Sequence, residues 1–264
     1  MVMKKYYFLA SLPRTGSTLL ASILNQHPNI HASATSALLD LLVAQANAVQ
    51  FNRGLYEITA EQEINLYLNM FDAYYKSINK EFIFDKHRAW PNLINPLKKM
   101  GNENPKMIVT LRPVPEIITS YISLIKKNPT SPNFIDELLT KKGIEINDKN
   151  RAMTIWSDYV SIPHSVIVNA IKTNKENLLF LQYDDIVNNP NKVLTDIYNF
   201  FGIESYDGYD FNNIQNNQAE KDESGWKLKD LHKIRPQLKK ESASPTEVLG
   251  EALVDYFSQF NIKI

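Results

Sequence analysis

Short apolar runs alternate along this chain with stretches in which apolar residues recur at helical spacing. The runs that predict strands are 6–10, 81–84, 106–111 and 178–181. The helical stretches are 17–25, 36–49, 59–79, 116–127, 151–173 and 187–201. Because strands that alternate with helices form parallel βαβ units, the pattern predicts an α/β protein with a central, mainly parallel sheet flanked by helices. We expect one domain over residues 1–264, since no linker or internal repeat interrupts the pattern.

Local signals refine these boundaries. Thr59 and Gln62 have the spacing of a capping box, and Ser244-Pro245 with Glu247 has the composition of another helix start. Pro163 predicts a bend in the helix over 151–173. The polar stretch 128–149 is predicted to be a surface insertion, and 203–224 a long loop.

Composition narrows the class of protein. The 264 residues are 44% hydrophobic and 22% charged, as in soluble globular proteins, and the formal net charge is +0. A neutral chain has no global attraction to nucleic acid or to an anionic membrane, so we expect neither partner. The absence of cysteine excludes disulfides, thiolate metal ligands and thiol catalysis.

The sequence also bears on location. The apolar run after Met1 is too short for a signal peptide, and no segment reaches the roughly 18 apolar residues of a membrane-spanning helix. A chain without cysteine suits a reducing compartment. We therefore expect a cytoplasmic protein, and the oligomeric state is not indicated.

The first predicted strand is followed by a glycine-containing loop, 11–18, that opens a helix. Free backbone N–H groups and the helix dipole at such a position favour a phosphate or sulfate. The loop lacks the Gly-Lys-Ser/Thr core of a nucleotide-triphosphate P-loop, because Ser17 follows Gly16 where lysine should stand. The positive charge is supplied by Arg14 instead. This disfavours a P-loop kinase or a magnesium-dependent hydrolase.

The segment Leu-Pro-Arg-Thr-Gly-Ser-Thr-Leu-Leu, residues 12–20, with the later His27-Pro28, resembles the 5′-phosphosulfate loop of sulfotransferases. It is most similar to the tyrosylprotein branch and to bacterial and phage relatives of that branch. The resemblance implies a three-layer, P-loop-like fold. It also implies that 3′-phosphoadenosine 5′-phosphosulfate (PAPS) is the co-substrate. A sulfuryl group would then pass to a hydroxyl-bearing acceptor, with release of adenosine 3′,5′-bisphosphate (PAP) and no need for a metal.

The resemblance assigns the donor site residue by residue. The 5′ end would contact the loop residues Arg14, Thr15, Gly16, Ser17 and Thr18. The 3′-phosphate would contact Arg112, at the end of the strand over 106–111, and Ser120 on the next helix. Tyr183 after the last strand would approach the nucleotide. Lys233 and Arg235, in the basic segment 225–236, would cover the phosphates.

Catalysis of sulfuryl transfer needs a cation where the leaving oxygen gains charge. The resemblance assigns this role to Lys86, with Arg14 as the second cation. The general base is harder to place, because residues 29–39 lack the carboxylate of the tyrosylprotein branch. This argues against protein tyrosine as the acceptor. His87 is the first candidate for the base, followed by Asp40 and His31.

Two alternatives stay open. A chain that kept the donor site but lost the base would be a non-catalytic PAPS- or PAP-binding module. A P-loop kinase is the third possibility. The acceptor is a carbohydrate, a small molecule or another hydroxyl compound, and the segments 128–149 and 203–224 are expected to shape its pocket.

Overall fold

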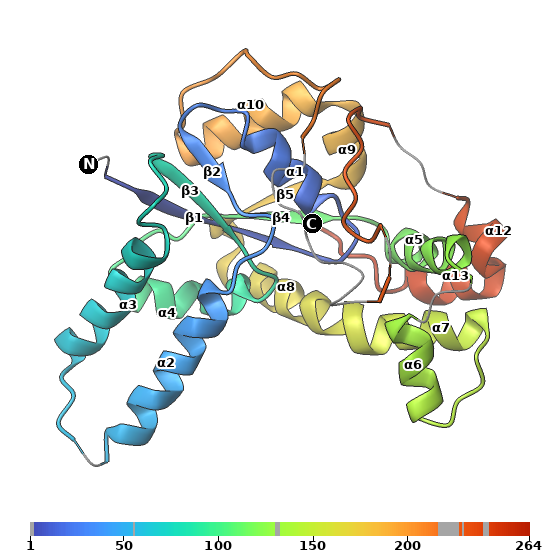
Figure 1. Cartoon of the computed structure of the whole chain (residues 1–264), viewed down its shortest axis with the longest axis horizontal. Helices are drawn as coiled ribbons and strands as arrows, with labels where there is room; N and C mark the ends of the chain where they lie inside the picture. The colour runs from blue at the N-terminus through green and yellow to red at the C-terminus, as the bar shows by residue number, and fades with distance from the viewer. Residues whose placement is uncertain (1–2, 55, 130–132, 216–226, 229, 240–242) are drawn as a thin grey trace.

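A parallel sheet of five strands lies at the centre of the computed structural model, in the order β2-β3-β1-β4-β5 (Figure 1). The structure describes residues 3–54, 56–129, 133–215, 227–228, 230–239 and 243–264. The strands are Lys5–Ser11 (β1), Ile30–Ala32 (β2), Phe82–Lys86 (β3), Met107–Leu111 (β4) and Leu178–Gln182 (β5). The predicted α/β fold with a parallel central sheet is therefore confirmed.

Helices surround this sheet. Those in the first half of the chain are Ser17–Leu24 (α1), Leu38–Asn52 (α2), Ala60–Tyr74 (α3), Ile94–Lys99 (α4) and Val114–Lys127 (α5). The later ones are Phe134–Lys141 (α6), Asp148–Ile155 (α7), Ser161–Asn174 (α8), Tyr183–Asn188 (α9), Pro190–Phe201 (α10), Pro245–Leu249 (α12) and Glu251–Ser258 (α13). Figure 1 shows α2 and α3 projecting from the sheet as an antiparallel pair.

Two hydrophobic cores cover the two faces of the sheet. Neighbouring strand residues point to opposite faces, and Phe8 and Leu9 of β1 accordingly enter different cores. Leu9 packs with residues of α1, α9 and α10. Phe8 packs on the other face with residues of α2, α3 and α5, and its ring lies 4.3 Å from that of Trp90. Both faces are buried, which is why these strands read as continuous apolar runs.

Several short elements had no prediction from the sequence. β2 is only Ile30–Ala32, which is too short to show a strand period. The 3-10 turn Trp90–Leu93 leads into α4, a single short helix. The predicted helix over 187–201 is also divided, because Asn189 precedes Pro190 and leaves the helical conformation between α9 and α10.

The long helical stretch over 151–173 is interrupted by a π-helical segment, Trp156–Val160. Pro163 follows within the first turn of α8 and has no N–H to donate to the preceding turn. The irregularity thus falls just before the proline, where the sequence predicts a bend.

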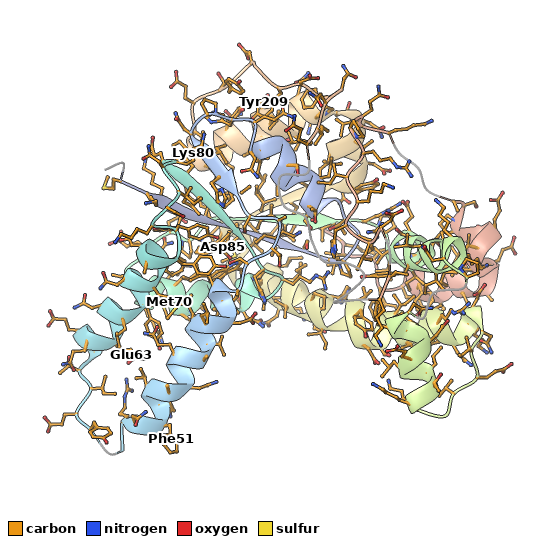
Figure 2. The ribbon with its side chains drawn as sticks, in the orientation of Figure 1. Phe51, Glu63, Met70, Lys80, Asp85 and Tyr209 are labelled. Atoms are coloured by element: carbon orange, nitrogen blue, oxygen red, sulfur yellow. The ribbon has the colours of Figure 1, made fainter. Side chains whose placement is uncertain are left out.

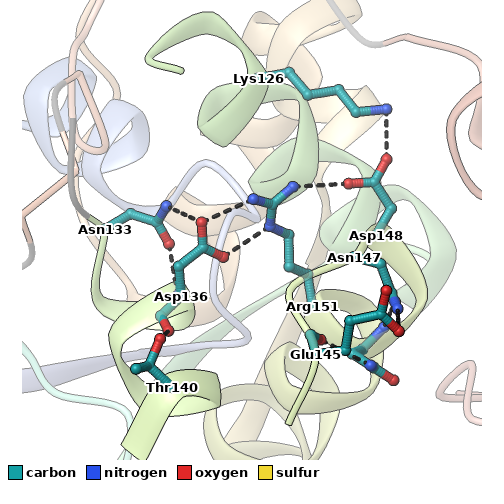
Figure 3. A network of polar contacts seen from close by, with 9 residues as sticks. Lys126, Asn133, Asp136, Thr140, Glu145, Asn147, Asp148 and Arg151 are labelled. Atoms are coloured by element: carbon teal, nitrogen blue, oxygen red, sulfur yellow. Dashed lines mark hydrogen bonds and ion pairs between the residues drawn. The ribbon is translucent and has the colours of Figure 1, made fainter. Parts of the chain in front are cut away.

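The prediction of a surface insertion over 128–149 is only partly correct. Residues of this stretch form α6, whose Ile135 and Leu139 are fully buried in the core. Arg151 of α7 holds α6 in place, donating from Nε and Nη2 to the two carboxylate oxygens of Asp136, at 2.7 Å each (Figure 3). Ile135 and Leu139 gave no clear helical signal because the residues around them are mostly polar.

Near the C-terminus the helix begins at Pro245 as predicted, although the Ser244 side chain makes no capping hydrogen bond. Of the predicted loop over 203–224, residues 203–215 are free of helix and strand, and the remainder lies outside the described residues. No helix in the described ranges has the length and apolar character needed to span a membrane.

The capping box at α3 is confirmed and can be tested. Thr59 Oγ1 accepts from the Gln62 N–H at 3.1 Å, and Gln62 Oε1 accepts from the Thr59 N–H at 2.9 Å. We expect Thr59→Ala to lower the free energy of unfolding by about 1 kcal/mol, the usual cost of a lost N-cap. Urea denaturation measures this. Thr173→Ala, at an exposed threonine inside the last turn of α8, is the matched control and should cost less.

Candidate active site

The carboxyl ends of β1, β3 and β4 meet at one edge of the sheet, where β1 pairs with β3 on one side and β4 on the other. Ligands of open α/β sheets bind at such an edge. A cavity of about 780 Å³ lies there. Its described lining includes residues 13–19 of the first loop and the start of α1, Lys86 at the end of β3, Arg112 after β4 and Tyr183 after β5.

The first loop turns sharply because two of its residues adopt left-handed backbone angles. Arg14 has φ +60° and Gly16 has φ +78°. Thr15 is buried between them, and its hydroxyl donates to Leu12 O at 2.7 Å and lies 2.7 Å from Thr110 Oγ1 of β4. Gly16 then begins α1 without a side-chain cap. The N–H groups of the first turn have no partner within the helix, as at any helix start, and suit an anion.

Tyr183 closes against this loop. A Cβ on Gly16 would lie 2.8 Å from Tyr183 Cδ2, so only glycine fits at this position without a shift. The other neighbour of the ring is Arg112, whose guanidinium carbon is 4.4 Å from the ring centroid, within cation–π range. Tyr183 therefore connects the first loop with the end of β4.

Arg112 is almost buried, at 7% exposure. Its Nε donates to Glu116 Oε2 at 3.0 Å, and its Nη1 donates to Arg14 O at 3.3 Å. Its Nη2 is buried without a hydrogen-bond partner among the described residues, and so is the hydroxyl of Thr119, which also lines the cavity. Buried donors are costly to leave unpaired. An anion bound beside Arg112 would satisfy Nη2.

Ser120 contacts Arg14, whereas the prediction from the sequence grouped Ser120 with Arg112 and assigned Arg14 to the other end of the donor. Arg14 Nε donates to Ser120 Oγ at 3.1 Å, and Arg14 Nη1 donates to the carbonyl oxygen of Leu231. The first loop, α5 and the C-terminal segment thus meet at one arginine. An anion that bound Arg14 and Ser120 together would compete with the bond between them.

Lys86 reaches the same loop from β3. Its Nζ donates to Thr18 Oγ1 at 2.7 Å, and its backbone N–H donates to Ser33 Oγ at 2.8 Å. The ammonium group consequently lies at the first turn of α1, beside the backbone groups that suit an anion. This is the position at which a developing negative charge could be stabilised.

His87 is placed differently from the other predicted residues. It is absent from the described lining of the cavity. Its Nδ1 accepts from the Ala89 N–H at 3.2 Å, and its Nε2 lies 3.6 Å from Asp40 Oδ1. The neutral ring therefore carries its proton on Nε2, facing the carboxylate. The candidates His87 and Asp40 form a pair, whereas His31 packs against the ring of Tyr75.

The C-terminal segment contributes further charge. Lys233 and Arg235 both line the cavity, and Lys233 Nζ lies 3.3 Å from Asp230 Oδ2. Asp230 is the only carboxylate among the described lining residues. A chain of net charge +0 thus concentrates positive charge in this cavity, which favours a ligand with several negative charges.

Sequence reasoning missed some of these residues. Glu116, in the first turn of α5, pairs with Arg112, but Arg112 precedes that helix and the helical pairing rule therefore gave no signal. Arg88 lines the cavity and was not singled out. Thr110 and Thr119 had no signal, since a lone threonine in an apolar strand or helix is commonplace.

Comparison with known proteins agrees with this geometry. A family profile described as "Sulfotransferase family" matches residues 7–208. The match spans well over half of the chain and contains the first loop, Lys86, Arg112 and Ser120. The protein therefore belongs to the sulfotransferase family, and is an enzyme of that family. A search of curated sequences found no match.

Solved structures show the same fold. The sulfotransferase domain from the curacin biosynthetic pathway aligns over 100% of this chain and 94% of its own, with 16% identity and a TM-score of 0.50. The sulfotransferase domain of the Synechococcus olefin synthase aligns over 98% and 95%, with 16% identity and a TM-score of 0.50. A mouse sulfotransferase complexed with PAP aligns over 98% and 84%, with 15% identity and a TM-score of 0.54.

The close approach of Gly16 and Tyr183 can be tested by substitution. Gly16→Ala adds a strained backbone angle, a cost of about 1–2 kcal/mol, and also pushes the Tyr183 ring. Gly143→Ala is the control, because Gly143 has φ +66° but nothing within 4 Å of an added Cβ. We expect Gly16→Ala to reduce the free energy of unfolding more than Gly143→Ala in urea denaturation. Equal losses would contradict the packing of Tyr183 on the loop.

Proposed function

We propose that this enzyme transfers a sulfuryl group from PAPS to a hydroxyl of an acceptor and releases PAP. The observation that carries the proposal is the second anion position at Arg112. Its buried Nη2 lacks a partner among the described residues, and it lies beside a loop that is itself suited to an anion. A donor with a 3′-phosphate as well as a 5′-phosphosulfate requires two such positions, and ATP does not.

The binding roles follow from this arrangement. The backbone of Thr15 to Thr18 and the Arg14 side chain would hold the 5′ end. Arg112 and Ser120 would hold the 3′-phosphate, with Tyr183 supporting Arg112 through its ring. Lys233 and Arg235 would contact the phosphates from the C-terminal segment.

PAPS supplies an activated sulfuryl group, and the chain supplies fixed charge around it. As the bond between sulfur and the bridging oxygen breaks, that oxygen gains negative charge, and Lys86 and Arg14 would stabilise it. We propose these two cations as sufficient, with no metal ion in the reaction. Lys86 is held by Thr18 before the reaction begins, so little reorganisation is needed.

The acceptor hydroxyl must lose a proton as the new S–O bond forms, and we propose His87 as the base. The proton would go to Nδ1, because Nε2 already carries one. This step would replace the Ala89 N–H bond, and Asp40 would stabilise the resulting imidazolium. The acceptor would then approach from the side of Ala89, opposite to Asp40 of α2.

We further propose that residues 1–264 act as one domain. This is supported by the C-terminal helices: Phe257 of α13 is fully buried in the core beneath the sheet, and Asn261 Oδ1 accepts from the Val114 N–H at 2.8 Å. The cytoplasm is the proposed compartment, which the lack of cysteine supports.

A thermal-shift comparison tests the donor. Ligands that bind the folded protein raise its stability by an amount set by their concentration and Kd, about 2.7 kcal/mol at one hundred times Kd. We expect PAP to raise Tm and ATP with magnesium to leave it unchanged at the same concentration. Stabilisation by ATP with magnesium alone would contradict the proposal. Turnover of labelled PAPS over a panel of hydroxyl acceptors then separates an enzyme from a binding protein.

Two substitutions separate binding from catalysis. Arg112→Ala removes charge-assisted hydrogen bonds of about 1.5–3 kcal/mol, so PAP affinity should fall roughly 10- to 100-fold. Lys86→Ala should lower kcat by about 10²–10³ and change PAP affinity much less, because its charge is needed in the transition state. Calorimetry measures PAP affinity, and turnover assays measure kcat.

The controls are Arg53→Ala and Lys192→Ala, which remove exposed ion pairs outside the cavity. Equal losses of PAP binding in the two site variants would contradict the assigned roles.

A further inference from the structure

A carboxylate that the proposed reaction does not use lies directly before Lys86. Asp85 is the residue of β3 between Phe84 and Lys86, and it has 0% exposure. Figure 2 shows it between the sheet and the base of the α2–α3 pair. A fully buried aspartate is rare unless its oxygens are satisfied.

Three hydrogen-bond donors converge on Asp85 from three separate segments. Ser36 Oγ, before α2, and Tyr75 OH, after α3, each donate to Oδ2 at 2.5 Å. Trp90 Nε1, in the turn after β3, donates to Oδ1 at 2.7 Å. The aspartate therefore joins both ends of the α2–α3 pair, and the following turn, to the end of β3.

Each of the three contacts supplies a hydrogen to a carboxyl oxygen of Asp85. Trp90 Nε1 can only donate. Ser36 Oγ accepts from the Leu38 N–H at 3.1 Å, so its own hydrogen is available for Asp85. Burial raises the pKa of Asp85, and the three donors oppose that rise by stabilising the charged form. The pKa stays above its ordinary value, and the carboxyl group is held by neutral groups in a network whose geometry depends on each member.

The same strand end is also fixed through its backbone. Ser33 N–H donates to Phe84 O at 3.0 Å, and Ser33 Oγ accepts from the Lys86 N–H at 2.8 Å. Lys86 Nζ then reaches Thr18 Oγ1 on the first loop. Asp85 and Lys86 share a peptide unit, so a rotation that moved the aspartate would move the lysine off the loop.

We propose that Asp85 is a positioning residue that holds Lys86 against Thr18, and that through Ser36 and Tyr75 it makes the position of Lys86 depend on the α2–α3 pair. The inference rests on the role of Lys86 in the proposed function. A displacement of about 1 Å in a catalytic group can cost on the order of 10²-fold in rate. A network of buried hydrogen bonds next to Lys86 prevents such a displacement.

Tyr75→Phe is the most conservative test, because it removes one hydroxyl and keeps the ring in the core. We expect kcat for transfer from PAPS to fall about tenfold, while PAP affinity stays within about twofold. The substitution should have little effect in a Lys86→Ala background, because the group that Asp85 positions is then missing. An equal loss of rate in both backgrounds would overturn the proposal.

Tyr6→Phe is the matched control. Tyr6 OH donates to Asp72 Oδ1 at 2.5 Å, so this variant also removes a tyrosine–carboxylate bond to the α3 region. That bond lies at the opposite, amino end of the strands. We expect Tyr6→Phe to leave kcat unchanged at temperatures where both variants are folded. A loss as large as that of Tyr75→Phe would indicate a general effect on stability and overturn the proposal.

A second measurement does not require turnover. The rate at which an amine-specific reagent modifies Lys86, followed by mass spectrometry, reports how firmly Nζ is held. We expect this rate to rise severalfold in Tyr75→Phe and in Asp85→Asn, and to stay unchanged in Tyr6→Phe. An unchanged rate in both Asp85-network variants would refute the positioning role. If the wild-type protein bound PAP but transferred nothing, the proposed function would fail, and the labelling rates would still decide this inference.

Discussion

The guanidinium of Arg112 holds together the side of the site proposed for the PAPS donor. It stands at the end of β4, donates to Glu116 of α5 and to the carbonyl of Arg14, and lies over the ring of Tyr183. These contacts bring the first loop, α5 and α9 to one point. Because a nearly buried cation is costly without partners, its position is strongly determined, and the partners are determined with it. The same contacts fix the position of the third nitrogen, Nη2, which has no partner among the described residues.

Asp85 is the corresponding buried group on the other side of β1. It stands at the end of β3, and three neutral donors surround it. Two buried ionisable groups therefore flank the central strand: Arg112 at the end of β4, and Asp85 beside Lys86 at the end of β3. Between them lies the loop from Pro13 to Thr18. Arg112 donates to the carbonyl oxygen of Arg14 in this loop, and Lys86 donates to Thr18. The hydrogen bonds at the strand ends hold Arg112 and Lys86 at one cavity, in a protein with a net charge of +0.

Much of the fold followed from local pattern. Fully buried parallel strands give uniform apolar runs, so β1, β3, β4 and β5 were recognisable. β2 was too short to show a period, and α6 placed its two buried side chains in a polar stretch. In both cases the burial comes from neighbours that are distant in the sequence. The capping box at Thr59 depends only on residues within one turn, and it formed as predicted.

The sequence alone determined the chemistry available at the first loop, since the order Arg14, Gly16, Ser17 fixes both the turn and the missing lysine. It also determined that Arg112 and Ser120 lie on consecutive elements. The tertiary structure decided which side chains share a cavity. It put Lys86 on Thr18, turned His87 towards Asp40, and made Asp85 the meeting point of segments from 36 to 90. Adjacent residues of a strand face opposite ways, so the surroundings of residues 85 to 87 depended on which helices cover each face, and no local pattern specifies that.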